Sequence, residues 1–179
     1  LGGALIGLFR TDDGEFTKEN ALMTATSAED GSFSFENIPC GTWYVREIEQ
    51  PTGFVLDDTI YPVTIGTDGQ VVEIEIVNEY GRGNIHLTKV DSEYPDNKLT
   101  GAVFEVYKDS NNNSKLDEGD ELLGTLTEKE IGEYGMNDLF YGRYFVKETK
   151  APDGFVLDTD VYEVVIDTDG KTYDVENKA

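Results

Sequence analysis

Three polar residues, Lys89, Glu148 and Asn177, occupy positions where apolar side chains are expected. In a β-strand alternate residues share one face, and each of these residues ends an apolar row. The rows are Ile85 and Leu87 before Lys89, Tyr144 and Val146 before Glu148, and Tyr173 and Val175 before Asn177. Buried charges are costly unless they are paired or neutralised. We therefore expect the three side chains to meet in one buried cluster.

An amine, a carboxyl group and a carboxamide held together in a buried site can form an amide bond. Burial disfavours the charged forms of lysine and glutamate, and a neutral amine can attack the carbonyl carbon of Asn177. A protonated Glu148 would donate a hydrogen bond to the Asn177 carbonyl oxygen and pass protons to the departing ammonia. Fixed contact supplies the effective concentration that free groups lack. The alternative is an unreacted, hydrogen-bonded cluster.

The stretch that carries Glu148 occurs twice. Residues 41–57 and 142–158 align without a gap at a spacing of 101 residues, which makes Glu47 the equivalent of Glu148. A spacing this constant indicates the tandem duplication of a whole domain. We expect one domain over residues 1–80 and a second over residues 81–179.

The elements that position these residues are short and alternate between apolar and polar residues. Ser32–Phe35 and Val72–Asn78 are predicted strands, and Ala21–Thr26 fits either a strand or a single helical turn. Frequent glycine turns and the lack of a helical period predict an all-β fold, with two tandem β-sandwiches.

Composition excludes several classes of function. The formal net charge of -23 argues against a nucleic-acid partner, since phosphate binding requires a basic face. It also disfavours anionic membrane surfaces, and no apolar run is long enough to span a bilayer. We therefore expect no membrane insertion of this segment. The single cysteine excludes an intramolecular disulfide and a cysteine-based metal cluster.

The motifs around the three polar residues are specific. They are Lys89-Val-Asp, Leu99-Thr-Gly-Ala-Val-Phe104, Tyr144-x-x-x-Glu148-x-x-Ala-Pro-x-Gly-Phe155 and Val175-x-Asn177-Lys178. In these motifs the chain resembles the Cna B-type (SpaA-type) domains of Gram-positive surface adhesins and pilins. The resemblance covers nearly the whole chain and implies a transthyretin-like β-sandwich.

The resemblance also implies a chemistry. In that family the lysine of the first strand and the asparagine of the last strand form an autocatalytic isopeptide bond. Lys89 would be the nucleophile, Asn177 the acceptor and Glu148 the catalyst, with no cofactor required. The implied location is extracellular, on the wall-anchored surface of a Gram-positive bacterium, and the implied partners are neighbouring domains of the same surface protein.

A second candidate site is the stretch from Asp109 to Glu121. It places oxygen ligands at alternate positions, as in the calcium loop of an EF-hand. The candidate ligands are Asp109, Asn111, Asn113, the Lys115 carbonyl, Asp117, and Asp120 or Glu121. Ser114 stands where that loop has glycine, and the flanking elements are predicted strands. The two interpretations are a calcium site and a solvated hairpin loop.

The first copy lacks a lysine equivalent to Lys89. Because Gly3-Ala4 aligns with Gly101-Ala102, the lysine-bearing first strand has no counterpart within residues 1–80. Glu47 and Asn78 remain on core faces, so Asn78 would be an acceptor without a lysine. Lys18 is the single lysine of this copy and lies near a predicted turn. We expect Lys18 not to be cross-linked.

These observations predict a non-enzymatic stalk module, apart from the self-catalysed bond. The alternative is a ligand-binding adhesin region that recognises a host glycan or matrix protein. That alternative requires an exposed aromatic or polar cluster, for which Phe140, Tyr141 and Phe145 are candidates. An enzyme acting on external substrates is disfavoured because no nucleophile–base pair or catalytic metal cluster is present in the sequence.

Overall fold

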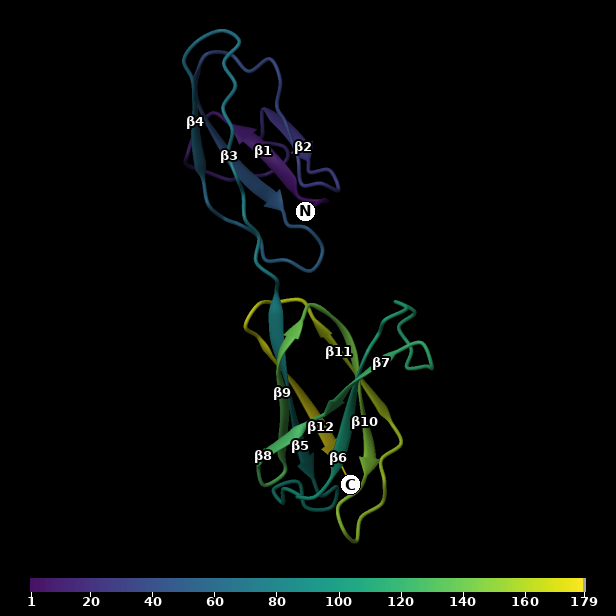
Figure 1. Cartoon of the computed structure of the whole chain (residues 1–179). Coiled ribbons are helices and arrows are strands. Elements are labelled where there is room, and N and C mark those ends of the chain that lie inside the picture. Colours follow the sequence, from purple (N-terminus) through teal and green to yellow (C-terminus); the bar gives the residue numbers. More distant parts are fainter. Residues whose placement is uncertain (179) are drawn as a thin grey trace. The chain divides into compact units, whose positions relative to one another are not determined.

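The computed structural model describes residues 1–178, and within them the chain forms strands and no helix. It divides into two compact units, Leu1–Tyr80 (unit 1) and Gly81–Ala179 (unit 2), drawn in Figure 1 from purple to yellow along the sequence. The prediction of an all-β chain of two tandem β-sandwich domains is confirmed.

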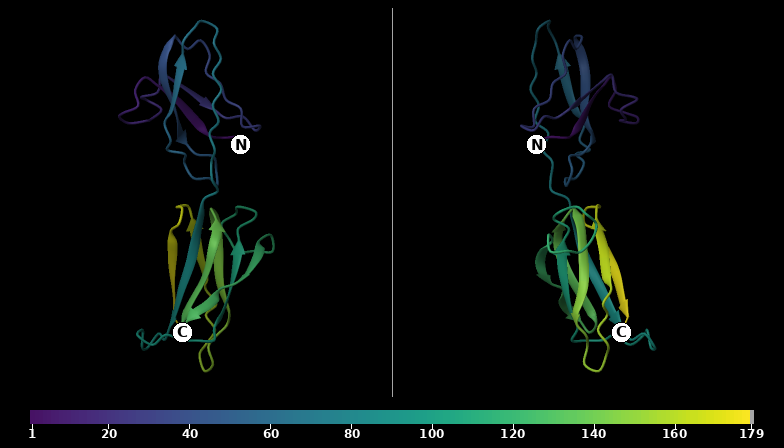
Figure 2. Two further views of the ribbon diagram at one scale, coloured as in Figure 1. Left: turned by 60° about the vertical axis from the view of Figure 1, so that its left-hand side comes forward. Right: turned by 90° about the vertical axis from the view of Figure 1, so that its right-hand side faces the viewer.

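Unit 2 consists of two four-stranded sheets that face each other, as the two views in Figure 2 show. One sheet has the order β11-β10-β6-β7 and the other the order β12-β5-β9-β8. The strands of the first sheet are β6 (Val103–Lys108), β7 (Glu121–Thr125), β10 (Gly142–Lys150) and β11 (Val161–Ile166). Those of the second are β5 (Arg82–Val90), β8 (Thr127–Glu130), β9 (Glu133–Phe140) and β12 (Thr172–Lys178).

The core of unit 2 lies between these sheets and follows the alternation in the sequence. Ile85 and Leu87 from β5 are 1% and 0% exposed, and they share one cluster with Tyr144 and Val146 from β10. Burying each such side chain contributes about 1.5–3 kcal/mol. Lys89 and Glu148 continue these two rows and are therefore buried as well.

Most neighbouring strands in the two units are antiparallel, but β12 runs parallel to β5. Their register places Tyr173 beside Ile85, Val175 beside Leu87 and Asn177 beside Lys89. The last strand of unit 2 therefore brings its asparagine directly to the lysine of the first strand.

Unit 1 has one hydrogen-bonded sheet of order β2-β1-β3-β4. Its strands are β1 (Leu5–Phe9), β2 (Met23–Thr26), β3 (Gly41–Glu49) and β4 (Tyr61–Ile65). The stretch Ala21–Thr26, which fitted a strand or a helical turn, contains a strand. Ala4, Ile6 and Leu8 are buried against Trp43 and Val45, as the alternation along β1 predicts.

Two predicted strands of unit 1, Ser32–Phe35 and Val72–Asn78, do not form hydrogen-bonded ladders. Their apolar side chains do pack on the core: Phe33, Phe35, Ile74 and Ile76 contact the cluster around Trp43. The equivalent segments of unit 2 are β9 and β12, and both pair with β5. Unit 1 has no strand equivalent to β5 among its described residues. Residues 32–35 and 72–78 are therefore extended but do not pair with a neighbouring strand.

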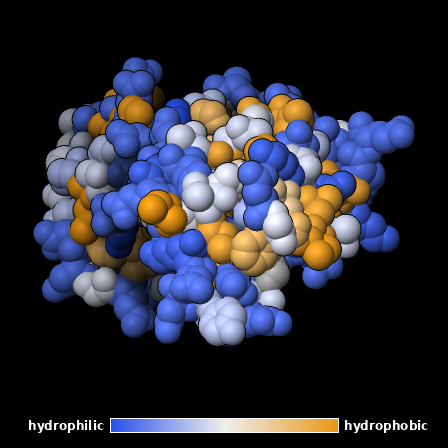
Figure 3. Space-filling view, turned by 90° about the horizontal axis from the view of Figure 1, so that it is seen from below, coloured by the Kyte–Doolittle hydropathy of each residue, from blue (hydrophilic) through white to orange (hydrophobic). Residues whose placement is uncertain are grey.

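The exterior is dominated by polar and acidic side chains. The face shown in Figure 3 is mostly hydrophilic, with separate hydrophobic clusters. In residues 1–178 no helix has the length and apolar character needed to cross a membrane. Most of the acidic side chains that give the high negative charge are exposed or half-buried, and Glu47, Asp109 and Glu148 are the buried ones among the described residues.

Candidate functional site

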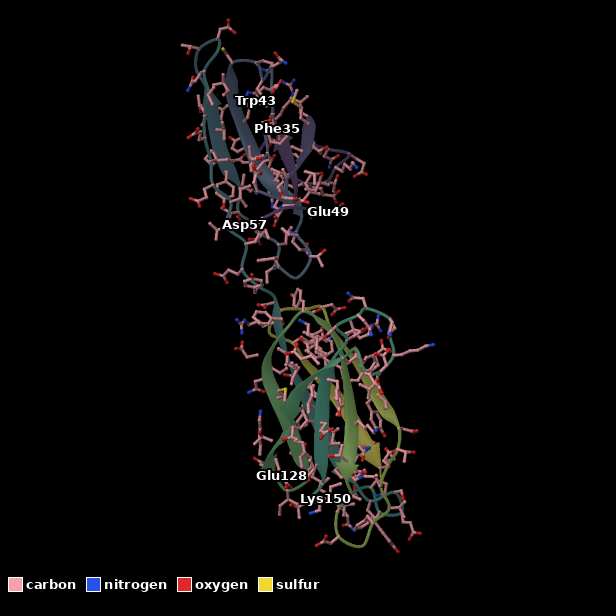
Figure 4. The ribbon with its side chains drawn as sticks, turned by 45° about the vertical axis from the view of Figure 1, so that its right-hand side comes forward. Phe35, Trp43, Glu49, Asp57, Glu128 and Lys150 are labelled. Carbon is pink, nitrogen blue, oxygen red and sulfur yellow. The ribbon has the colours of Figure 1, made fainter. Side chains whose placement is uncertain are left out.

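The Lys89 triad, defined as Lys89, Glu148 and Asn177, is assembled from both sheets of unit 2. Lys89 comes from β5, Asn177 from β12 and Glu148 from β10. Their exposures are 0%, 0% and 1%, respectively. The triad lies at the end of unit 2 where Figure 4 labels Lys150, two residues beyond Glu148 on β10. The sequence prediction that these three residues meet in the core is supported by this geometry.

Lys89 contacts both other members of the triad. Its Nζ donates a hydrogen bond to Asn177 Oδ1 and lies 3.0 Å from Glu148 Oε1. The second carboxylate oxygen, Glu148 Oε2, accepts a hydrogen bond of 2.8 Å from the backbone amide of Asp158. The Asp158 amide therefore holds Glu148 Oε2, and Glu148 Oε1 faces the Lys89 amine.

This arrangement differs in one respect from the expected one. Glu148 was expected to hydrogen-bond the carbonyl oxygen of Asn177, but that oxygen faces Lys89 Nζ instead. Glu148 Oε1 contacts the amine. A carboxylate in this position is placed to accept a proton from Lys89. To polarise the Asn177 amide, the Glu148 carboxyl group would have to move from Lys89 Nζ toward Asn177 Oδ1.

Two residues that the sequence analysis missed hold the amide nitrogen of Asn177. Asn177 Nδ2 donates hydrogen bonds to Asp158 Oδ2 at 2.6 Å and to the Tyr162 hydroxyl at 3.1 Å. The Tyr162 hydroxyl in turn donates to Asp158 Oδ2 at 2.5 Å. The signal that could have found them is the repeat itself, because Asp57 and Tyr61 stand 101 positions earlier.

The environment shifts the pKa values of both residues. Burial would raise the pKa of Asp158, but hydrogen bonds from Tyr162 and the Asp160 amide, with the nearby Lys89 charge, bring it below its ordinary value. Burial and the hydrogen bond to Asp158 raise the pKa of Tyr162 to about 12. At neutral pH Asp158 is thus an ionised acceptor and Tyr162 a protonated donor, a combination that fixes the orientation of the Asn177 amide.

Unit 1 contains the same groups without the lysine. Glu47 is 1% exposed, and its Oε2 accepts hydrogen bonds from Asn78 Nδ2 at 2.7 Å and from the Asp57 amide at 2.8 Å. Tyr61 donates to Asp57 at 2.5 Å, as Tyr162 does to Asp158. Burial raises the pKa of Glu47, although the Asp57 and Asn78 hydrogen bonds oppose that rise. Lys18 is exposed.

The loop proposed for calcium is stabilised by its own hydrogen bonds. The Asp109 carboxylate accepts from the Asn113 and Ser114 amides at 3.1 and 3.0 Å, and Asp117 accepts from the side chains of Asn111 and Asn113. Ser114 adopts a φ of 62°, the left-handed conformation for which an EF-hand loop uses glycine. Within residues 1–178 no cluster of three or more His, Cys, Asp or Glu side chains is arranged to hold a metal. Calcium binding stays a prediction.

The candidate aromatic cluster for ligand binding is not a surface cluster. Phe145 is 3% exposed, although the alternation placed it on the more polar face of β10. Phe140 is 42% exposed and lies beneath the Arg82 guanidinium, at 4.2 Å, and Tyr141 packs against the core. The interpretation of Phe145 as an exposed residue was wrong: its side chain is buried, although it lies outside the core cluster of Ile85 and Leu87, and its neighbours in register are Tyr107 on β6 and Glu163 on β11.

The chain consists of two β-sandwich units, and one of them buries a lysine in contact with a glutamate and an asparagine. These features define a class of structural repeat domain. The description "SpaA: Prealbumin-like fold domain" matches residues 1–80 and 83–179, and the chain belongs to this family. The resemblance inferred from the motifs is confirmed.

Three relatives illustrate the range of similarity. The "Trypsin-resistant surface T6 protein" of Streptococcus pyogenes serotype M6 is 35% identical over 80 residues, covering 45% of this chain and 13% of that protein. The Bacillus anthracis TIE protein is 28% identical, with a TM-score of 0.76 over 99% of this chain and 31% of that one. A C-terminal fragment of the pilus adhesin SpaC from Lactobacillus rhamnosus GG shares the fold, with 17% identity and a TM-score of 0.50 over 98% of this chain and 88% of the fragment.

The chain thus spans less than a third of the length of the T6 and TIE proteins. What these comparisons establish is the family and the fold.

Proposed function

We propose that this chain is a structural segment of a Gram-positive surface adhesin or pilus-like protein, stiffened by a self-formed amide bond between Lys89 and Asn177. The observation that carries the proposal is the burial of Lys89, Glu148 and Asn177 together, with Lys89 on β5 in contact with both Glu148 on β10 and Asn177 on β12. A buried charge pair of this kind is a weak source of stability. Its conversion to a neutral amide removes the buried charges.

The reaction needs only the groups of the site. Glu148 accepts a proton from Lys89 Nζ, and the neutral amine attacks the Asn177 side-chain carbonyl carbon, Cγ. The new Nζ–Cγ bond forms, Glu148 passes its proton to Nδ2, the Cγ–Nδ2 bond breaks and ammonia leaves. The second Nζ proton goes to Glu148, which ends neutral beside the new amide. Asp158 and Tyr162, which bind Nδ2, orient the leaving group. No cofactor takes part, and the reaction occurs once per molecule, so the chain is not an enzyme for external substrates.

The consequence is mechanical. Lys89 and Asn177 are 88 positions apart and lie on the first and last strands of unit 2. By the loop-entropy treatment of disulfides, closing a loop of this size stabilises the fold by about 4–5 kcal/mol. Tension applied at the two ends of the unit passes through the amide instead of separating β5 from β12. Reductants do not cleave this bond, which suits a chain with one cysteine.

This function places the chain outside the cell, in a protein anchored to the cell wall, with neighbouring domains of that protein as its partners. Recognition of a host glycan or matrix protein is the alternative function. Its structural support is weakened because Phe145 is buried. Binding to an array of glycans and matrix proteins tests the alternative directly.

Peptide mapping tests the proposal. Trypsin does not cleave after an acylated lysine, so the wild-type digest should contain a branched peptide that joins the Lys89 and Asn177 segments. The variant Glu148→Gln should yield the two segments separately. Glu176→Gln is the matched control, since Glu176 adjoins Asn177 on the exposed face of β12, and it should retain the branched peptide. Separate wild-type segments in folded protein would refute the proposal.

A further inference from the structure

Two hydrogen-bond acceptors face the side-chain nitrogen of Asn177. Asp158 Oδ2 accepts a hydrogen bond from Asn177 Nδ2 at 2.6 Å, and the Tyr162 hydroxyl oxygen accepts one at 3.1 Å. The Tyr162 hydroxyl donates its own hydrogen to the same Asp158 oxygen, at 2.5 Å, so it presents a lone pair to Nδ2. A carboxamide nitrogen carries two hydrogens, and the site supplies one acceptor for each of them.

Asp158 is held as an ionised acceptor. Its other oxygen, Oδ1, accepts a hydrogen bond from the Asp160 backbone amide at 2.9 Å. Burial opposes ionisation of Asp158, but hydrogen bonds from Tyr162 and the Asp160 amide, with the Lys89 charge, lower its pKa below the ordinary value. An ionised carboxylate has no hydrogen to donate. Asp158 therefore attracts a donor group at position 177 and repels a second acceptor.

The oxygen of the Asn177 carboxamide faces a donor instead. Asn177 Oδ1 accepts a hydrogen bond from Lys89 Nζ, and Lys89 Nζ also lies 3.0 Å from Glu148 Oε1. Asn177 is 0% exposed, so bulk water does not reach a mismatched group at this position. A buried polar site discriminates strongly against a side chain that leaves its hydrogen-bonding groups unpaired.

Formal charge makes the same distinction. Lys89 supplies one positive charge to the site, and Glu148 and Asp158 supply two negative charges. An ionised aspartate at position 177 would add a third carboxylate, with an oxygen in the place of Nδ2, which lies 2.6 Å from Asp158 Oδ2. Two carboxylates in such close contact cannot both stay ionised. An aspartate at this position would have to take up a proton, whereas asparagine needs none.

We propose that Asp158, supported by Tyr162, is the specificity-determining residue of the cross-linking reaction in unit 2: it admits asparagine as the acceptor and excludes ionised aspartate. This specificity rests on the proposed function, because it belongs to the same reaction. It differs from an orienting role, since replacing the Asp158 carboxylate with a carboxamide should change which acceptor side chain reacts.

An aspartate acceptor would form the same amide with water as the leaving group. The neutral Lys89 amine attacks Cγ of the protonated carboxyl group, the Nζ–Cγ bond forms, the Cγ–O bond breaks, and water leaves with a proton from Nζ. With Asp158 ionised, the proton on the acceptor carboxyl group comes from solution. With asparagine at position 158, the site keeps its original balance of charge, and that proton comes from the Lys89 ammonium.

Three forms of the 179-residue chain test the specificity: the unaltered chain, Asn177→Asp, and the double variant Asn177→Asp/Asp158→Asn. Each is made by cell-free synthesis, and the branched tryptic peptide is measured at intervals, because a succinimide at position 177 has the same loss of mass. At about pH 8, Asn177→Asp should react at least about tenfold more slowly than the unaltered chain, since few of its molecules carry the required proton. The double variant should react at least about tenfold faster than Asn177→Asp.

The dependence on pH separates exclusion by charge from loss of packing. Transfer of Asn177→Asp after synthesis from about pH 8 to about pH 6 should accelerate cross-linking, by up to about tenfold for each pH unit, because one proton is required. The double variant should show a weaker dependence. His86, the single histidine, lies on β5 and contacts Asp174 on β12, so its NMR signal reports whether unit 2 is folded in each variant.

Asn177→Asp/Asp160→Asn is the matched control. The Asp160 side chain is exposed, and Asp160 holds Asp158 through its backbone amide, so this change removes a nearby carboxylate but leaves the one that faces position 177. The control should react as slowly as Asn177→Asp. If Asn177→Asp alone does not fold, the double variant still decides, because it should both fold and cross-link, and its failure to do either would overturn the inference.

Four outcomes overturn the inference while the unaltered chain yields the branched peptide, so they leave the proposed function in place. They are a rate for Asn177→Asp equal to that of the unaltered chain at about pH 8, a rate independent of pH, a double variant no faster than Asn177→Asp, and an equal gain from Asp160→Asn. Absence of the branched peptide from the unaltered chain and from every variant contradicts the proposed function, and this specificity with it.

Discussion

Asn177 stands directly opposite Lys89 in the parallel register of β12 with β5, and its Oδ1 accepts a hydrogen bond from the lysine Nζ. A parallel pairing between the first and last strands is the feature that allows one short bond to connect distant parts of the chain. Substitutions of residues that contact Lys89 or Asn177 should therefore affect cross-linking, and substitutions of exposed neighbours should not.

Replacing Glu148 with glutamine should prevent the cross-link. Glutamine has nearly the same shape but cannot accept a proton from Lys89. Loss of the closed loop should lower the free energy of unfolding of unit 2 by about 4–5 kcal/mol. Thermal unfolding followed by circular dichroism measures this change. The exposed control Glu176→Gln should unfold as the wild type does, and an unchanged melting temperature for Glu148→Gln would contradict the stabilising role.

Replacing Asp158 with alanine should slow bond formation without abolishing it. The substitution removes the acceptor for Asn177 Nδ2 but keeps the backbone amide that binds Glu148. A hydrogen bond to a charged group contributes about 1.5–3 kcal/mol, which corresponds to a slowing of about tenfold or more. Mass spectra taken at intervals after synthesis give the rate. The exposed Asp160→Asn should react at the wild-type rate, and an unchanged rate for Asp158→Ala would show that the carboxylate has no orienting role.

Unit 1 should become less stable as the pH rises above about 4.5, the ordinary pKa of a glutamate. The folded state raises the pKa of Glu47 by burial, so folding favours its protonated form. That contribution to stability is fully present below the unfolded-state pKa and is lost as the pH rises through the folded-state pKa. Denaturant unfolding followed by Trp43 fluorescence reports on unit 1, because Trp43 is the single tryptophan and lies in the core of that unit. Glu47→Gln should reduce this pH dependence and raise stability near neutral pH; a pH dependence that persists unchanged would exclude Glu47 as its source.

The loop from Asp109 to Glu121 gives a conditional test for calcium. If calcium binds the folded loop, adding it should raise the melting temperature and a chelator should reverse the rise, because a ligand that binds only the folded state stabilises it. Asp109→Ala should remove that response, and Asp153→Ala, in an exposed loop of the same unit, should retain it. Identical melting curves with calcium and with chelator would favour the solvated loop.

The triad could be predicted from the sequence because strand alternation has a fixed period of two. That period placed Lys89, Glu148 and Asn177 on buried faces. Asp158 and Tyr162 could not be found in this way, since their role depends on hydrogen bonds from a loop and an adjacent strand. Comparison of the two repeats would have indicated them.

Alternation also overpredicted the strands of unit 1. Residues 32–35 and 72–78 do carry apolar side chains inward, as the pattern requires. A β-ladder depends in addition on a neighbouring strand, which local sequence does not specify. The difference between a buried extended segment and a paired strand therefore became visible only in the structure.

The intact mass of the folded wild-type chain, measured after denaturation, tests the central proposal most directly. We expect a mass one ammonia below that calculated from the 179-residue sequence, and the full calculated mass for Glu148→Gln. Full mass in the folded wild-type protein would show that Lys89 and Asn177 remain separate and would contradict the proposed cross-link.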